Sequence, residues 1–195
     1  MGETTKGLAE AVFSTESDEA SKVRWPFDFR LEYRIAIGET LKLELEMKNT
    51  GPTGVRFQEA LHTYFNVGDV KPARVHGLDG VFYLDNTDGN REKQQRADLA
   101  FTRQTDNAYR NATGPVEIHD PVLHRRVRTE KRNSASTIVW NPWSDGAAKL
   151  ADLADAEWRR MLCVEGGNVL DCAIELEPGA AHVLGIEISV QMNSD

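Results

Sequence analysis

The sequence lacks the features of secreted, membrane-spanning and disulfide-rich chains. It has two cysteines, Cys163 and Cys172, in 195 residues and no CxxC pattern, so reduced thiols in a cytoplasmic protein are the simplest interpretation. No apolar run approaches the ~20 residues that cross a bilayer. The first residues, MGETTKGLAEAVF, lack the basic and apolar regions of a secretory signal. We therefore predict a cytoplasmic protein without membrane association.

Positive charge is also scarce. The formal net charge is −8, which repels a phosphate backbone, so we expect no extended nucleic-acid interface. Residues 124–132 are locally basic but contain no aromatic side chain to stack on bases, which favours a strand with a solvated, charged outer face. No two of the five histidines have the i,i+2 or i,i+4 spacing of paired metal ligands. We expect neither a metal nor a cofactor, and a cupin-like metal site is the weaker alternative.

Alternation with a period of two dominates the chain. Residues 41–47 alternate strictly between apolar and polar, residues 31–37 do so more loosely, and Gly38-Glu39-Thr40 between them predicts a hairpin. A long strand over 182–192 follows the Pro178-Gly179 turn. Further strands are expected at 8–13, 55–65, 81–84, 138–140 and 161–165. Helical periodicity occurs only at 147–159, and 86–95 is typical of an exposed loop. This pattern predicts a single all-β sandwich or barrel domain over residues 1–195.

The segment 55–65 carries the most chemistry. If it is one strand, Val55, Phe57, Leu61, Thr63 and Phe65 face one side, with Glu59 interrupting, and Arg56, Gln58, Ala60, His62 and Tyr64 face the other. Solvated strand faces are usually richer in Lys and Glu, so the second face indicates the lining of a polar pocket around His62. Taken alone, a histidine in such a place is more often structural.

Two other segments add candidates. Residues 161–165 form an apolar strand that ends on Glu165, whose pKa desolvation could raise toward that of a general base; a solvated strand-end acid is the alternative. Residues 139–143, VWNPW, place two tryptophans around an Asn-Pro turn. We expect core packing for Trp140. Trp143 fits either a packed corner or an aromatic platform for a sugar ring.

Several of these segments together, in order, resemble one family. LHTYFNVGD at 61–69, TDNAY at 105–109, VWNPW at 139–143 and MLCVEGGN at 161–168 are similar to the hexose-6-phosphate mutarotases of the aldose 1-epimerase superfamily. The resemblance extends from about Ser17 to the C-terminus. It implies a galactose-mutarotase-like β-supersandwich that interconverts the α and β anomers of glucose 6-phosphate or a related sugar, without metal or cofactor.

The resemblance also implies roles for individual residues. His62 would protonate the ring oxygen, Glu165 would take the proton of the anomeric hydroxyl, and Asp106 would accept hydrogen bonds from sugar hydroxyls. We add Arg56, Gln58 and Trp143 as candidate sugar contacts, with Arg56 and Arg74 as candidate phosphate contacts because they flank the 61–65 segment.

Members of the family are longer, and the resemblance implies that this sequence lacks their first third. That part carries strands of the sandwich, a second histidine in a His-Gly-Phe segment, and arginines for the sugar phosphate. Its absence would leave sheet edges and apolar faces exposed. The alternative to an enzyme is therefore a non-catalytic carbohydrate-binding sandwich, or an inactive fragment that keeps only the fold.

Overall fold

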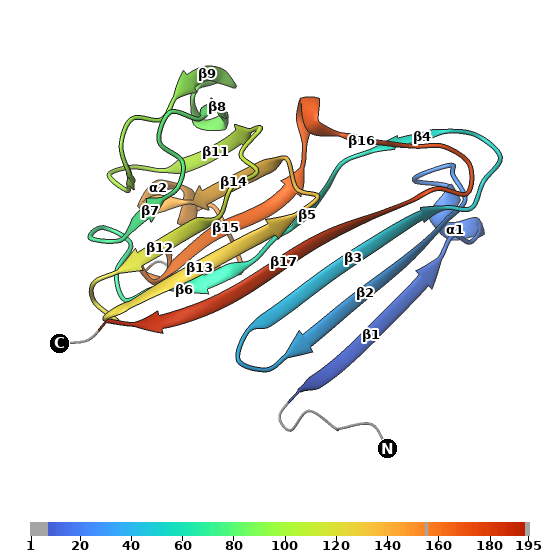
Figure 1. Cartoon of the computed structure of the whole chain (residues 1–195). Helices are drawn as coiled ribbons and strands as arrows, with labels where there is room; N and C mark the ends of the chain where they lie inside the picture. Colours follow the sequence, from blue (N-terminus) through green and yellow to red (C-terminus); the bar gives the residue numbers. More distant parts are fainter. Residues whose placement is uncertain (1–7, 155, 194–195) are drawn as a thin grey trace.

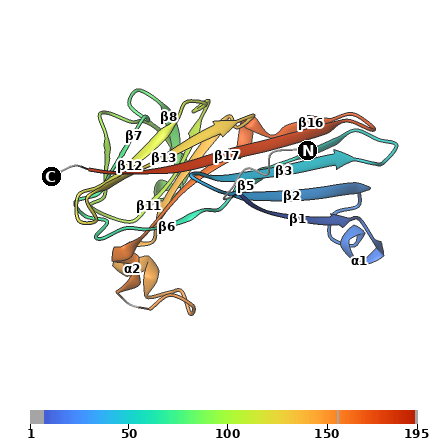
Figure 2. The ribbon, with the colours of Figure 1, turned by 60° about the horizontal axis from the view of Figure 1, so that its bottom comes forward.

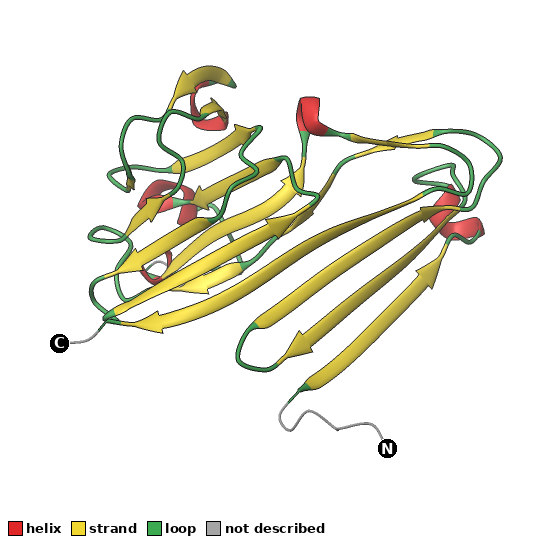
Figure 3. Ribbon diagram, in the orientation of Figure 1, coloured by secondary structure: helices red, strands yellow, loops and turns green. Residues whose placement is uncertain are grey.

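A computed structural model describes residues 8–154 and 156–193 of the chain. Over these residues the protein is built almost entirely of strands, with a few short helical turns at the ends of the sheets (Figure 1, Figure 3). The all-β class predicted from the alternation is confirmed. No helix in these two ranges is long and apolar enough to cross a bilayer.

The larger sheet, as far as the chain is described, has eight strands. In spatial order they are β1 (Ala9–Glu16), β2 (Phe29–Ile37), β3 (Leu41–Asn49), β17 (Ala181–Met192), β13 (Arg125–Arg132), β12 (Val116–Asp120), β7 (Arg74–His76) and β10 (Leu99–Ala100). Neighbouring strands are antiparallel throughout. The predicted hairpin is β2–β3, and the predicted C-terminal strand is β17.

The second sheet has seven strands in the described ranges. Its order is β5 (Glu59–Leu61), β15 (Met161–Asn168), β14 (Ser136–Asn141), β11 (Thr105–Arg110), β8 (Phe82–Asp85) and β9 (Arg91–Gln94), and β6 (Tyr64–Asn66) also pairs with β15. A separate two-stranded ribbon joins β4 (Val55–Phe57) to β16 (Ile174–Leu176). The helical turns are α1 (Glu19–Lys22), η1 (Asn86–Asp88), α2 (Trp143–Ala147), η2 (Glu157–Arg160) and η3 (Leu170–Cys172).

The main core lies between the two sheets. Alternate residues of β12, β13 and β17, such as Ile118, Val127 and Ile186, face the inward side of the second sheet, where Tyr109, Val139 and Leu162 are buried. Burial of such apolar surface on both inner faces is the main stabilising contribution in a sandwich. The outward face of the second sheet is consequently left to polar and aromatic side chains.

The N-terminal hairpin extends beyond the second sheet. Figures 1 and 2 show β1, β2 and β3 side by side, projecting past the sandwich. A small separate core supports them, in which Met47, Val55 and Leu176 are buried against Trp25 and neighbouring aromatic side chains. Every residue of β1 is exposed, including Phe13 at 60%. The strand β1 therefore presents an exposed sheet face with apolar side chains.

Three sequence predictions are wrong in detail. Residues 55–65 are not one strand: β4 belongs to the ribbon with β16, and β5 and β6 are separate segments on the edge of the second sheet. Instead of the helix expected at 147–159, α2 ends at Ala147 and η2 begins at Glu157, and residue 155 lies outside the described residues. Asn141 donates to the carbonyls of Trp158 and Met161 across this turn. Residues 86–95 contain η1 and β9 rather than loop alone.

The basic segment 124–132 is largely the strand β13, and several of its charges form ion pairs. Arg128 forms ion pairs with Glu117 and Glu130, and Arg132 with Glu44. Lys131 differs, because its amine turns inward and donates to the Ala112 carbonyl and the Thr137 hydroxyl. Burial beside these neutral partners lowers the pKa of Lys131 from 10.5 to about 8.

Lys131→Met is expected to stabilise the fold at pH 7, by on the order of 1–2 kcal/mol, because it removes a charge buried without a carboxylate partner. In the wild type the unfolded chain holds more protons than the folded one between about pH 8 and 10.5. The free energy of unfolding therefore rises with pH through that window, and the variant should lose this rise. Urea unfolding at pH 7 and 10 measures both effects. Lys42→Met, at an exposed position of β3, is the control; a Lys131→Met protein less stable than wild type at pH 7 contradicts the interpretation.

Candidate active site

His62 and Glu165 meet on the outward face of the second sheet. His62 Nε2 lies 3.3 Å from Glu165 Oε1, with the histidine side chain 51% exposed and the glutamate side chain 5% exposed. The contact follows from strand pairing. β5 pairs Leu61 with Gly166, and β6 pairs Tyr64 with Cys163, in the same antiparallel register. Continuing that register across the gap sets His62 opposite Glu165.

The edge strand is interrupted at this point. The Thr63 amide donates to the Leu61 carbonyl over 2.9 Å instead of pairing with β15, so the backbone turns sharply at His62. The two glycines after Glu165 allow close packing on both sides. A Cβ at Gly166 would lie 2.8 Å from the Ile186 side chain, and one at Gly167 would lie 2.6 Å from the Glu59 carbonyl. The two glycines thus let β15 approach β17 of the other sheet and its own neighbouring strand β5.

Glu165 is more deeply placed than the sequence indicated. The strand continues to Asn168, and all eight of its residues are buried, so Glu165 lies in the middle of β15 rather than at its end. Burial, with the nearby charge of Asp106, raises the pKa of Glu165 from 4.5 to about 7. A carboxyl group that titrates near neutrality can both take and return a proton at the pH of a cell.

Two aromatic rings surround His62. The His62 ring stacks on Tyr64 with centroids 4.7 Å apart, and the Trp140 ring meets it edge-on at 6.0 Å. Tyr64 and Trp140 are both in one cross-strand row with Asp106 and Cys163, because Trp140 pairs with Asp106 on one side and with Cys163 on the other. The sequence favoured core packing for Trp140, but it is half-buried and contacts His62. The position of Trp140 beside His62 follows from the pairing of β14 and β6 with β15, which the sequence pattern does not predict.

Asp106 lies on the same face, one strand beyond Trp140. Its carboxylate accepts a hydrogen bond from Asn86 over 2.9 Å. Burial raises the pKa of Asp106, the Asn86 hydrogen bond opposes that rise, and the charge of Asp85 adds to it. Asn86 lies in the polar segment 86–95, whose composition predicts an exposed loop, so the sequence gives no sign of its contact with Asp106.

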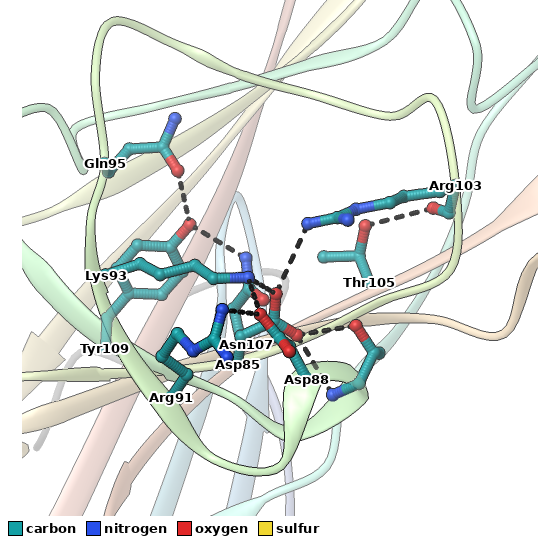
Figure 4. Close-up of polar contacts among 10 residues, drawn as sticks. Asp85, Asp88, Arg91, Lys93, Gln95, Arg103, Thr105, Asn107 and Tyr109 are labelled. Carbon is teal, nitrogen blue, oxygen red and sulfur yellow. Dashed lines mark hydrogen bonds and ion pairs between the residues drawn. The ribbon is translucent and has the colours of Figure 1, made fainter.

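Asp85 fixes the turn that carries Asn86. Figure 4 shows the Asp85 carboxylate at the centre of a polar cluster, with Lys93 at 2.7 Å and Arg103 at 3.3 Å. The amide and hydroxyl of Thr87 also donate to it. Burial opposes ionisation of Asp85, but hydrogen bonds from Lys93 and Thr87 outweigh it, so its pKa lies below the usual range. Asp85 therefore stays charged and holds η1 beside β11.

The other candidate contacts lie elsewhere. Arg56 donates to the Leu170 carbonyl and Gln58 accepts from the Leu170 amide, so both hold the turn η3 instead of standing beside His62. Trp143 packs on Trp158 with ring centroids 4.5 Å apart, forming a packed corner. Arg74, on β7 of the other sheet, donates to the carbonyls of Lys71 and Ala73. Of the residues singled out from the sequence, the structure brings together His62, Glu165 and Asp106.

Glu59, which interrupts the apolar face in the sequence, has a structural explanation. Its carboxylate lies 2.9 Å from His182 Nε2 and accepts from Asn168 over 2.8 Å. Burial raises the pKa of Glu59, and Asn168 and His182 oppose the rise. This buried polar cluster joins β5, β15 and β17 behind the candidate site. It also gives His182 a context that the sequence did not supply.

Cys163 adds a third potential metal ligand to the pair. The donor atoms of His62, Cys163 and Glu165 all lie within 4.8 Å of one another. The spacing of histidines along the chain does not predict this group. Its cysteine and glutamate are two residues apart on β15, and its histidine lies between β5 and β6.

Comparison with known proteins places the chain in a family. A family model described as aldose 1-epimerase matches residues 3–189. The chain belongs to the aldose 1-epimerase family. A Cenchrus ciliaris protein named "Putative glucose-6-phosphate 1-epimerase" is 34% identical over 160 residues, which is 80% of this chain and 48% of that protein. A Salmonella typhimurium protein of the same name is 32% identical over 154 residues, 78% of this chain and 51% of that protein.

Solved structures share the fold. A Salmonella typhimurium structure titled as a putative mutarotase has a TM-score of 0.88 at 27% identity and is matched over 96% of this chain and 62% of that one. A galactose 1-epimerase from Lactobacillus acidophilus, at 12% identity and a TM-score of 0.75, covers 97% of this chain and 64% of that one, and shows the fold alone. The galactose-mutarotase-like sandwich is confirmed. The chain spans about half the length of the curated relatives it matches.

Glu165→Gln is expected to stabilise the protein at pH 8, by on the order of 1–3 kcal/mol. Because the pKa of Glu165 is raised from 4.5 to about 7, the folded chain holds more protons than the unfolded one between these values. The free energy of unfolding therefore falls as pH rises through that window. The variant should lose this fall and match wild type near pH 4. Thermal unfolding across pH 4–8 measures it.

Glu117→Gln is the control of opposite sign. Its hydrogen bonds from Arg128 and His119 lower the pKa of Glu117, so removing that charge should reduce stability at pH 8. A Glu165→Gln protein that loses stability at pH 8 as Glu117→Gln does would show that the Glu165 carboxylate is stabilised where it lies.

Proposed function

We propose that this chain carries the acid–base centre of a hexose-6-phosphate 1-epimerase, which interconverts the α and β anomers of the sugar without a cofactor. The observation that carries the proposal is the His62–Glu165 contact of 3.3 Å on a buried strand. The ring oxygen and the anomeric hydroxyl of an aldose are bonded to the same carbon. An acid and a base that serve them must therefore lie close together, as these two groups do.

The proposed reaction moves two protons and one bond. Glu165 takes the proton of the anomeric hydroxyl while His62 protonates the ring oxygen, the bond from C1 to the ring oxygen breaks, and an aldehyde forms at C1. Rotation about C1–C2 presents the other face of the aldehyde, and the ring closes with both proton transfers reversed. The raised pKa of Glu165, about 7, suits a group that must be an acid in one half of the cycle and a base in the other.

The remaining side chains on this face suit a sugar. Asp106 can accept hydrogen bonds from hydroxyl groups, and the Trp140 and Tyr64 rings offer apolar surface of the kind that packs against a pyranose. The assignment to a hexose 6-phosphate rests on the names of the relatives, which are glucose-6-phosphate 1-epimerases by name.

A second candidate is a carbohydrate-binding sandwich without catalysis. It is favoured by one observation: Asp106, Trp140 and Tyr64 form a polar and aromatic face that can bind a sugar without any proton transfer. The two candidates share the sugar-binding face and differ only in whether the anomers exchange faster than in buffer.

Exchange NMR between the anomers of glucose 6-phosphate tests the first candidate. Wild-type protein should accelerate exchange, and His62→Ala and Glu165→Gln should each reduce that acceleration by about 10²-fold or more, the usual contribution of a positioned acid or base. A protein that binds the sugar in a titration but does not accelerate exchange would instead establish the second candidate.

The chain supplies a matched control. Glu117 and His119 form another Glu–His pair, 3.1 Å apart, on the outer face of the other sheet. Glu117→Gln and His119→Ala should leave the acceleration unchanged. If they reduce it as much as the site variants do, the effect comes from general destabilisation and the assigned roles are wrong.

Asp106→Asn is expected to shift the pH profile of exchange toward lower pH. The base form of Glu165 is needed to begin the reaction, so wild-type activity should fall as the pH drops below about 7. The charge of Asp106 helps to raise the pKa of Glu165, and removing it lets Glu165 ionise at lower pH. An unchanged midpoint in the profile of the variant would show that Asp106 does not act on Glu165.

A further inference from the structure

We propose that His62, Cys163 and Glu165 form a binding site for a divalent transition metal of intermediate softness, with Zn²⁺ as the representative. The three donor atoms lie within 4.8 Å of one another. Zinc bonds to protein ligands are about 2.0–2.3 Å long, so tetrahedral ligands lie about 3.5 Å apart. The His62 and Glu165 donors, at 3.3 Å, already have this separation, and the thiol must approach them by up to about 1.3 Å.

The backbone holds these donors on one face. Cys163 and Glu165 are two residues apart on β15 and therefore point to the same side of the sheet. β15 is paired on both of its edges, with β14 on one and with β5 and β6 on the other. Two of the three ligands are thus fixed by the sheet. The third, His62, is half-exposed and can adjust to the metal.

The charges balance for a divalent ion. Burial and the charge of Glu165 raise the pKa of the Cys163 thiol, so the metal must displace the thiol proton when it binds. The resulting thiolate and the Glu165 carboxylate then carry −2 together, and a neutral imidazole adds a third ligand without further charge. The neighbouring Asp106 adds negative potential, since its charge acts on Glu165. In a desolvated place such a combination favours a cation.

The donor set also selects the kind of metal. A thiolate with an imidazole prefers zinc, cobalt or cadmium over the hard cations Mg²⁺ and Ca²⁺, which favour oxygen ligands. Three protein ligands leave one tetrahedral position, and the exposed side chains of His62 and Tyr64 give this side of the group access to solvent. The site is therefore open, of the kind that exchanges its metal.

Occupancy would oppose the proposed reaction. A metal bound to His62 Nε2 prevents this nitrogen from carrying the proton for the ring oxygen. A metal bound to the Glu165 carboxylate prevents it from accepting the proton of the anomeric hydroxyl. The metal and the sugar therefore compete for the same two groups. This inhibitory consequence rests on the proposed function. Metal binding itself does not, because it can be measured without any sugar.

Cobalt absorption and zinc calorimetry on the full chain provide the test. Wild-type protein should bind one equivalent of Co²⁺ with a thiolate-to-metal charge-transfer band, and should bind Zn²⁺ but not Mg²⁺. Cys163→Ser should abolish the band and weaken Zn²⁺ binding by at least about tenfold, because it removes the one sulfur ligand. His62→Ala, at a half-exposed position, should weaken binding similarly without changing the core.

Cys172→Ser is the matched control. Cys172 is the other free thiol and lies on η3, where its sulfur faces the Ala135 carbonyl. Its removal should leave both the band and the affinity unchanged. A band that persists in Cys163→Ser, a band lost in Cys172→Ser, or a folded wild-type protein that binds no Zn²⁺ would each overturn the proposal.

The inhibition is measured separately. Zn²⁺ should slow anomer exchange by wild-type protein and EDTA should restore it, while exchange by Cys163→Ser, relative to its own metal-free rate, should need at least about tenfold more Zn²⁺. Metal binding without any sugar exchange would reject the proposed function and keep the metal site. Exchange that Zn²⁺ leaves unchanged would reject the competition between metal and sugar.

Discussion

The desolvation of one carboxylate, that of Glu165, is the constraint on which the site depends. Every residue of β15 is buried, so an ionised carboxylate on this strand loses hydration, which is energetically unfavourable. The edge of the sheet is interrupted opposite Glu165, where His62 lies between β5 and β6. The pairing of His62 with Glu165 is therefore a property of strand register, since the two residues are 103 positions apart in the sequence.

Charge is arranged around this carboxylate in a graded series. Lys93 and Thr87 keep Asp85 ionised. Burial is the main cause of the raised pKa of both Asp106 and Glu165; the charge of Asp85 adds to the rise at Asp106, and the charge of Asp106 adds to the rise at Glu165. Like charges placed in sequence make each successive group easier to protonate. The cations of the cluster, Lys93 and Arg103, lie beside Asp85, whereas the pKa of Glu165 is raised to about 7. The polar cluster in Figure 4 thus supports the site although it lies outside it.

The open N-terminal part of the large sheet contrasts with this compact site. β1 is exposed along its whole length, and a hollow of about 470 Å³ lined by Trp25, Leu31, Leu45, Met47, Phe57 and nearby residues of β5 lies beside the small core. The contact between His62 and Glu165 depends on the pairing of β5 and β6 with β15 and not on β1, β2 or β3. The pair can therefore be well formed even though the sheet beyond it is uncovered.

Sequence patterns determined the fold class, the β2–β3 hairpin and the last strand, because alternation with a period of two survives wherever one face of a strand is buried. Ordered motifs also identified the family and named His62, Glu165 and Asp106. Patterns failed where tertiary contacts replace periodicity. The segment 55–65 divides between two sheets. Trp140, and not Trp143, contacts His62, and Arg56 and Gln58 hydrogen-bond to Leu170 in the turn η3. Cross-strand neighbours such as Cys163 and Asn86 became visible only in the structure, because register between strands far apart in the chain is set by packing of the whole sandwich and leaves no local trace in the sequence.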